Sequence, residues 1–174
     1  MFDKLTPGDN APNDINVIIE IPADSDPVKY EVHKDTGMLM VDRFMSTSMV
    51  YPCNYGYVPR TLCGDGDPLD VLVIAPFALY PGSMISCRPV GLMKMTDEAG
   101  VDAKILAVPS NKLTQIYHGV TEYSDLPESV IRRIAHFFEH YKDLEAGKWV
   151  NIDGWYGVDE AKKEILESIE NFGK

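Results

Sequence analysis

Three aspartates crowd one short segment, Asp65-Gly66-Asp67-Pro68-Leu69-Asp70, which runs directly into the apolar stretch Val71 to Val73. Carboxylates this close repel one another, and hard divalent cations that bind among them relieve the repulsion. An EF-hand calcium loop does not fit, because that loop needs a glycine at its sixth position and a glutamate at its twelfth. The segment therefore indicates either a divalent-cation site with oxygen ligands or a solvated acidic turn.

Two further segments place an acid and a base on one face of a predicted strand. Asp97 and Asp102 bracket a predicted turn, and Lys104 shares a strand face with Asp102 because side chains alternate along a strand. This pattern could hold a metal beside a cation that binds an anion, or it could be an ordinary solvated turn. Lys29 and Glu31 are related in the same way, with the tyrosine between them on the opposite face.

A buried acid and a group of hydrogen-bond donors complete the polar set. Glu20 lies inside the apolar strand Val17 to Ile21, where an unpaired charge is costly, so a cation is expected nearby. Arg43 is followed by three tyrosines in the irregular, turn-rich stretch that ends at Tyr57. A guanidinium and tyrosine hydroxyls are good donors to phosphate oxygens, although core packing is an alternative for at least one of the tyrosines.

Carboxylates, basic groups and tyrosine donors together are typical of phosphate transfer. The basic members of the set are Lys29, Arg43, Lys104 and Lys142. A protein that only buffers metal ions does not need them. A phosphate-transfer site needs metals and basic groups together, to neutralise the substrate, bind the leaving group and lower the pKa of a water molecule.

The elements that must position these groups change in type along the chain. From residue 15 to residue 108, short apolar or alternating runs are separated by Gly, Pro, Asp and Asn, which predicts strands joined by turns. At least five strands are expected, over residues 28–33, 38–43, 71–75, 84–95 and 101–108. Lys34 to Gly37 supplies the turn of a hairpin between the first two. A β-barrel or a β-sandwich follows.

The C-terminal third has helical periodicity. Pro127 suits a first helical turn, an apolar stripe runs from Val130 to Tyr141, and Gly147 offers a stop. A second helix is expected from Asp159, as its N-cap, to Phe172. Each apolar stripe must be buried, so both helices should pack on the outside of the β structure.

Composition indicates one intracellular domain over residues 1–174. The 27 acidic and 16 basic residues give a net charge of −11, which argues against nucleic acid or an anionic membrane as a partner. The N-terminus does not resemble a signal peptide, and no apolar stretch is long enough to span a bilayer. Three cysteines cannot all pair within the chain, which fits reduced thiols in the cytoplasm.

The sequence resembles the bacterial-type, family I soluble inorganic pyrophosphatases, collinearly from about residue 15 to residue 155. The segment from Asp65 to Val71 fits that family's D-[SGDN]-D-[PE]-[LIVMF]-D-[LIVMGAC] signature at every position. The other similar segments are residues 20–22, 29–31, 42–43, 51–57, 94–100, 102–104 and 140–142. The resemblance implies an α+β, mainly β fold, in which two C-terminal helices pack outside a five-stranded OB-like barrel. It also implies Mg²⁺-dependent hydrolysis of pyrophosphate to two orthophosphates, and a homohexamer.

The resemblance further implies a role for each site residue. The implied metal ligands are Asp65, Asp70, Asp97, Asp102 and Glu31. The implied general base is Asp67. The implied substrate-binding residues are Lys29, Arg43, Tyr55, Lys104, Tyr141 and Lys142, with Glu20 and Tyr51 supporting them.

The segment His136-Phe137-Phe138-Glu139-His140 matches the H-x-x-E-H motif of inverted zinc proteases. Both histidines fall away from the apolar stripe of the predicted helix, so they could face a ligand, solvent or another subunit. The resemblance favours a subunit interface over zinc chemistry. The hypothesis is that protonating these histidines weakens assembly.

Two other functions compete with pyrophosphate hydrolysis. One is a barrel that binds divalent cations or phosphate without turnover. The other is a hydrolase of the same fold that acts on nucleotides or another phosphoanhydride. The sequence contains no Walker A motif and no dinucleotide-binding loop, which disfavours nucleotides.

Overall fold

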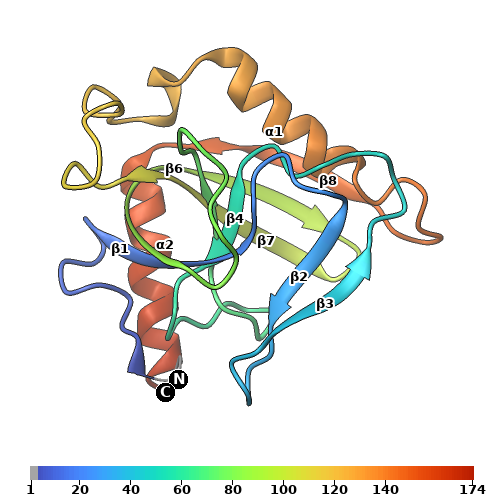
Figure 1. The fold of residues 1–174 in the computed structure, drawn as a ribbon, viewed down its shortest axis with the longest axis horizontal. Helices are drawn as coiled ribbons and strands as arrows, with labels where there is room; N and C mark the ends of the chain where they lie inside the picture. Colours follow the sequence, from blue (N-terminus) through green and yellow to red (C-terminus); the bar gives the residue numbers. More distant parts are fainter. Residues whose placement is uncertain (1–3) are drawn as a thin grey trace.

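The structure is a computed structural model that describes residues 4–174. In chain order its elements are β1 (Ile15–Ile21), β2 (Val28–Val32), β3 (Leu39–Phe44), β4 (Asn54–Tyr57), β5 (Asp70–Val73), β6 (Met84–Asp97), β7 (Gly100–Pro109), the 3-10 helix η2 (Tyr123–Asp125), α1 (Glu128–His140), β8 (Val150–Tyr156) and α2 (Val158–Phe172). Figure 1 shows the strands gathered into a barrel, with α1 across its top and α2 standing at its left.

Five strands close into a ring. They pair in the order β1-β4-β5-β7-β6, and β6 pairs back onto β1. The long strand β6 makes this closure possible, since residues 84–87 pair with β1 while residues 92–97 pair with β8. β5 and β7 run parallel, and the other pairs are antiparallel. The predicted OB-like barrel of five strands is confirmed.

The membership of the barrel differs from the sequence-based expectation. β2 and β3 form the expected hairpin, but they make a separate two-stranded sheet at the right of Figure 1. The stretch from Arg43 to Tyr57 is not irregular throughout, because its last four residues form β4. β8 was not predicted, and a register shift opposite Lys94 and Met95 interrupts its alternation.

Both faces of the central strands are buried, which explains their continuous apolar character. Along β7, Leu106 and Val108 join one buried cluster, which also contains Phe137 and Phe138 of α1. The alternate residues of β7 join a second cluster, which contains Ile165 of α2. The two helices thus cover different faces of the β structure, as the apolar stripes predict.

Both helix boundaries need correction. α1 ends at His140, seven residues before Gly147, where the chain turns toward the site described below. α2 begins at Val158, and its N-cap is Gly157 rather than Asp159. The carboxylate of Glu122, from the distant η2 segment, accepts the N–H of Val158 at 2.9 Å. That contact satisfies a backbone N–H at the start of the helix, as a local N-cap side chain would. Across residues 4–174, none of the helices combines the length and apolar character needed to cross a membrane.

Gly56 allows β4 to approach β1 closely. It lies opposite Ile19, and a Cβ at this position would overlap the carbonyl oxygen of Ile18 and lie 2.8 Å from its carbonyl carbon. Backbone atoms cannot move aside as a flexible side chain can. A side chain at position 56 would therefore push two barrel strands apart.

We expect Gly56→Ala to lower the free energy of unfolding by about 3 kcal/mol, because it overpacks the β1–β4 pair. The matched control is Gly64→Ala, since a Cβ there would meet no atom within 4 Å. Its stability should stay within about 0.5 kcal/mol of the native value. Urea unfolding followed by circular dichroism measures both changes. Equal stability of the two variants would contradict the proposed strand contact.

Candidate active site

One cavity of about 610 Å³ brings all fourteen predicted site residues together. Those lining it are Glu20, Lys29, Glu31, Arg43, Tyr51, Tyr55, Asp65, Asp67, Asp70, Asp97, Asp102, Lys104, Tyr141 and Lys142. They come from seven strands, the connection between β3 and β4, the acidic loop before β5 and the loop after α1. The cavity is therefore assembled from segments that are far apart in the sequence.

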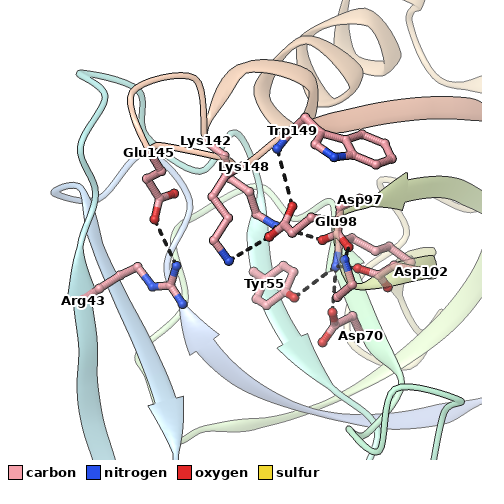
Figure 2. Close-up of polar contacts among 12 residues, drawn as sticks. Arg43, Tyr55, Asp70, Asp97, Glu98, Asp102, Lys142, Glu145, Lys148 and Trp149 are labelled. Carbon is pink, nitrogen blue, oxygen red and sulfur yellow. Dashed lines mark hydrogen bonds and ion pairs between the residues drawn. The ribbon is translucent and has the colours of Figure 1, made fainter.

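The ammonium of Lys104 lies at the buried end of the cavity. The parallel register of β5 and β7 places Asp70 directly opposite Lys104. The Nζ atom of Lys104 lies 2.7 Å from Asp70 Oδ2 and 3.0 Å from Asp102 Oδ2, and it donates to the Tyr55 hydroxyl at 3.3 Å. It also faces the rings of Tyr55 and Phe138, at 5.3 and 5.4 Å from their centroids. Figure 2 shows Tyr55, Asp70 and Asp102 converging at this point.

Burial and charge act against each other at this triad. Burial lowers the pKa of Lys104, but the negative charges of Asp70 and Asp102 outweigh it and hold that pKa well above its ordinary value. Burial raises the pKa of Asp102, and the nearby charge of Asp70 adds to this shift against the opposing effect of Lys104. Among Lys104, Asp70 and Asp102, the lysine therefore stays protonated, whereas Asp102 loses its proton less readily than an ordinary aspartate.

The loop before β5 carries the other two aspartates. The N–H of Asp67 donates to Asp65 Oδ1 at 3.0 Å, and Gly66 between them has a φ of +88°, a conformation that favours glycine. The carboxylate of Asp67 is 62% exposed and lies 2.6 Å from the ammonium of Lys34. Asp67 therefore sits on the open rim of the cavity, with a cation beside it.

The tip of the β6–β7 hairpin binds the loop that follows α1. Lys142 Nζ lies 2.8 Å from Asp97 Oδ2 and 3.4 Å from Glu98 Oε1. Glu98 also pairs with Lys148 at 2.8 Å and accepts the N–H of Trp149 at 3.4 Å, as Figure 2 shows. Burial acts to raise the pKa of Glu98, but the hydrogen bonds and positive charges of these partners outweigh burial and lower that pKa to about 2. These contacts hold Lys142 at the cavity wall.

The β2–β3 hairpin forms the opposite wall. Asp42 accepts from Arg43 Nε at 2.9 Å and lies 3.1 Å from Lys29 Nζ. Arg43 reaches Glu145 of the far loop at 3.2 Å, which links the two walls (Figure 2). Tyr30, which is predicted to lie on the opposite strand face from Lys29 and Glu31, also lines the cavity and packs against the core. The register of the hairpin shifts beside Tyr30, which breaks the simple alternation.

Glu20 forms no ion pair within residues 4–174, although the expected cation is nearby, since the charge of Lys29 acts to lower the pKa of Glu20. Its Oε1 accepts the N–H of Val32 at 2.8 Å. Burial raises its pKa to about 8, against the opposing effect of that hydrogen bond. The effect of burial thus exceeds that of Lys29 and of the hydrogen bond, and it favours the protonated carboxyl group at neutral pH.

The tyrosine rings pack in the core, which agrees with the alternative that core packing accounts for at least one tyrosine. Tyr51 is buried, with its ring centroid 4.6 Å from that of Phe137, and burial raises its pKa strongly. Tyr55 belongs to the same core cluster, yet its hydroxyl reaches Lys104. Tyr141 stacks on Phe137 at 5.2 Å. Core packing therefore fixes the rings, while the hydroxyl of Tyr55 serves the polar site.

Several charged residues of the cavity were not predicted. They are Lys34, Arg60, Glu98, Glu145 and Lys148. Glu98 lies within a segment that carries the family resemblance, so its position was available as a signal. The other four belong to loops without periodicity, and only the folded chain brings them to the cavity.

The donor chemistry of the cavity fits a divalent cation. Six carboxylates were predicted as metal ligands or as the base, and Mg²⁺ prefers oxygen ligands of this kind. Within residues 4–174, no three of these acids lie close enough together to form a metal-binding group. Lys104 lies between Asp70 and Asp102, and Lys142 lies beside Asp97. The lysines thus supply part of the positive charge that the acids require.

Known proteins match this chain over nearly its whole length. The family model described as inorganic pyrophosphatase matches residues 17–173. An inorganic pyrophosphatase of Yersinia pestis is 60% identical over 173 residues, which cover 99% of each chain. The solved structure of an inorganic pyrophosphatase from Coxiella burnetii superimposes with a TM-score of 0.94 at 51% identity, covering 97% of this chain and 99% of that one.

A more distant structure retains the same architecture. The inorganic pyrophosphatase from Thermus thermophilus is 39% identical and has a TM-score of 0.94, over 99% of both chains. Identity of this degree over full length, together with the barrel and the acid-rich cavity, goes beyond a shared fold. The chain therefore belongs to the bacterial-type, family I inorganic pyrophosphatases.

Proposed function

We propose that this chain hydrolyses inorganic pyrophosphate to two orthophosphates in a Mg²⁺-dependent reaction. The observation that carries the proposal is the composition of the cavity described above, where predicted carboxylate ligands alternate with lysines, an arginine and a buried tyrosine hydroxyl. Phosphoryl transfer depends mainly on positioning and on neutralising the charge of the phosphates. Family membership supports the same reaction.

The carboxylates of the cavity divide into metal ligands and a base. Asp65, Asp70 and Asp102 would hold the first Mg²⁺, and Asp97 and Glu31 would help to seat further ions. Bound Mg²⁺ would neutralise phosphate oxygens and lower the pKa of the attacking water. The raised pKa of Asp102, which follows from burial and from the charge of Asp70, supports an affinity for added positive charge.

Asp67 would serve as the general base. In the reaction, its carboxylate takes a proton from water, the water oxygen bonds to one phosphorus, and the bridging P–O bond breaks. The second phosphate leaves with the electron pair of that bond. An exposed carboxylate on the rim of the cavity suits this role, because its oxygens can reach both water and substrate.

The basic residues would hold the two phosphates. Lys29 and Arg43 stand on the hairpin wall, Lys142 on the opposite wall and Lys104 at the buried end. The hydroxyls of Tyr55 and Tyr141 would add donors. Buried Glu20 and Tyr51 would support this set from behind.

We also propose the cellular and oligomeric setting. Residues 1–174 would act as one domain in the cytoplasm, which agrees with free thiols at Cys53, Cys63 and Cys87. The functional unit would be a homohexamer. His136 and His140 would lie near a subunit interface, since His136 is exposed and the two rings are adjacent on α1, with centroids 4.7 Å apart.

We expect the native chain to release phosphate rapidly from pyrophosphate in the presence of Mg²⁺, and far more slowly from ATP. Asp67→Asn should lower kcat about 10²–10⁴-fold, since it removes the base. Asp159→Asn, an exposed change in α2, is the matched control and should leave kcat unchanged. Binding of Mg²⁺ and pyrophosphate without phosphate release would support the non-catalytic alternative instead.

Lys104→Met should destabilise the metal-free protein by about 3–5 kcal/mol, because it leaves two half-buried carboxylates without their cation. Mg²⁺ should then stabilise the variant more than the native chain, since the metal replaces the lost positive charge. Urea unfolding in EDTA and in Mg²⁺ measures both effects. Lys163→Met, which removes an exposed lysine of α2, serves as the control. Equal stabilisation of all three proteins would contradict cation binding at Asp70 and Asp102.

Mild acid should dissociate the hexamer, because protonation would place positive charges on two neighbouring imidazoles at the interface. Sedimentation velocity at pH 7.5 and pH 5.5 would follow the change. A variant carrying His136→Gln and His140→Gln should keep one oligomeric state at both values. An oligomer of the native chain that does not change with pH would refute the role of these histidines.

A further inference from the structure

The carboxylate of Asp67 has a single polar partner among the described residues. Backbone contacts fix its main chain, since its carbonyl accepts from Cys63 N at 2.8 Å and its N–H donates to Asp65 at 3.0 Å. Neither contact sets the orientation of the side chain. That orientation depends on Lys34, whose Nζ donates to Asp67 Oδ1 at 2.6 Å.

Lys34 is itself held in place by an ordered turn. It occupies the tip of the β2–β3 hairpin, where the N–H groups of His33 and Gly37 complete hydrogen bonds of 2.8 Å across the turn. The hydroxyl of Thr36 accepts the N–H of Met38 at 3.3 Å. From this turn, Lys34 reaches the carbonyl of Gly66 at 3.3 Å as well as Asp67. The lysine therefore joins the hairpin to the acidic loop.

We propose that Lys34 is a positioning residue for Asp67, an inference that rests on the proposed role of Asp67 as the base. Lys34 occupies Oδ1 and leaves Oδ2 to accept the proton of the attacking water. A catalytic base is commonly oriented by a third group that binds its other polar atom. Lys34 meets this description, because it binds Asp67 Oδ1 and is not itself one of the predicted site residues.

Because the Lys34–Asp67 pair is exposed, an effect of Lys34 on catalysis can be distinguished from an effect on folding stability. The side chains of Lys34 and Asp67 are 58% and 62% exposed. Ion pairs this exposed contribute little to folding, because water screens them. Loss of Lys34 should therefore leave the fold intact while the carboxylate of Asp67 gains rotational freedom. A catalytic effect without a stability effect is the expected signature.

The first test compares Lys34→Met and Lys34→Arg with the native chain, using steady-state kinetics with pyrophosphate and saturating Mg²⁺. Lys34→Met should lower kcat about tenfold, with KM within about twofold of the native value. Lys34→Arg should recover most of kcat, since it restores a cationic donor. Lys163→Met removes a comparably exposed lysine that does not line the cavity and should change neither constant. All four proteins should unfold at the same temperature.

The second test repeats Lys34→Met in the Asp67→Asn background. If Lys34 acts through Asp67, the double variant should have the kcat of Asp67→Asn alone. The inference is overturned if the two losses multiply, if Lys34→Met leaves kcat unchanged, or if it raises KM while kcat stays native. A native kcat for Asp67→Asn would refute the base itself and the inference with it, whereas a large loss there combined with a silent Lys34→Met refutes the inference alone.

Discussion

The buried ammonium of Lys104 between Asp70 and Asp102 is the constraint on which the site depends. A lysine only 4% exposed is tolerated when acids of good geometry compensate its charge. Asp70 reaches it because β5 and β7 are parallel neighbours with Asp70 opposite Lys104, and Asp102 reaches it because it lies two residues away on the same face of β7. Assembly of the polar site therefore requires the correct register of β5 against β7, since a slip of one residue would send these side chains to the other face.

The rest of the cavity is joined by ion pairs rather than by the barrel. The hairpin, the acidic loop and the loop after α1 each contribute one partner to a pair that spans two segments. Ion pairs on each wall thus bring charges of both signs together before any ligand arrives. A highly anionic substrate with its metal ions can exchange these internal partners for its own, so charge need not be left uncompensated during binding.

Local patterns predicted the parts of the molecule that local sequence controls. Alternation placed Asp102 and Lys104 on one strand face, and the helical stripe identified α1 from Phe137 and Phe138. The convergence of fourteen residues on one cavity came from the family resemblance, since strand periodicity relates only close neighbours. Long-range contacts account for the misses: Glu122 caps α2 from 36 residues away, and Lys34 meets Asp67 across 33 residues. Neither contact can be predicted from the spacing of residues along the sequence.

The separate β2–β3 hairpin has a consequence for how the molecule can move. It shares no strand ladder with the closed ring. The N–H of Val32 donates to Glu20 of β1, and the links of the hairpin to the opposite loops are half-exposed ion pairs. Segments held in this way open at far lower free energy than a barrel core. The wall that the hairpin forms is therefore held less firmly than the carboxylates of Asp70 and Asp102, whose strands β5 and β7 belong to the closed ring.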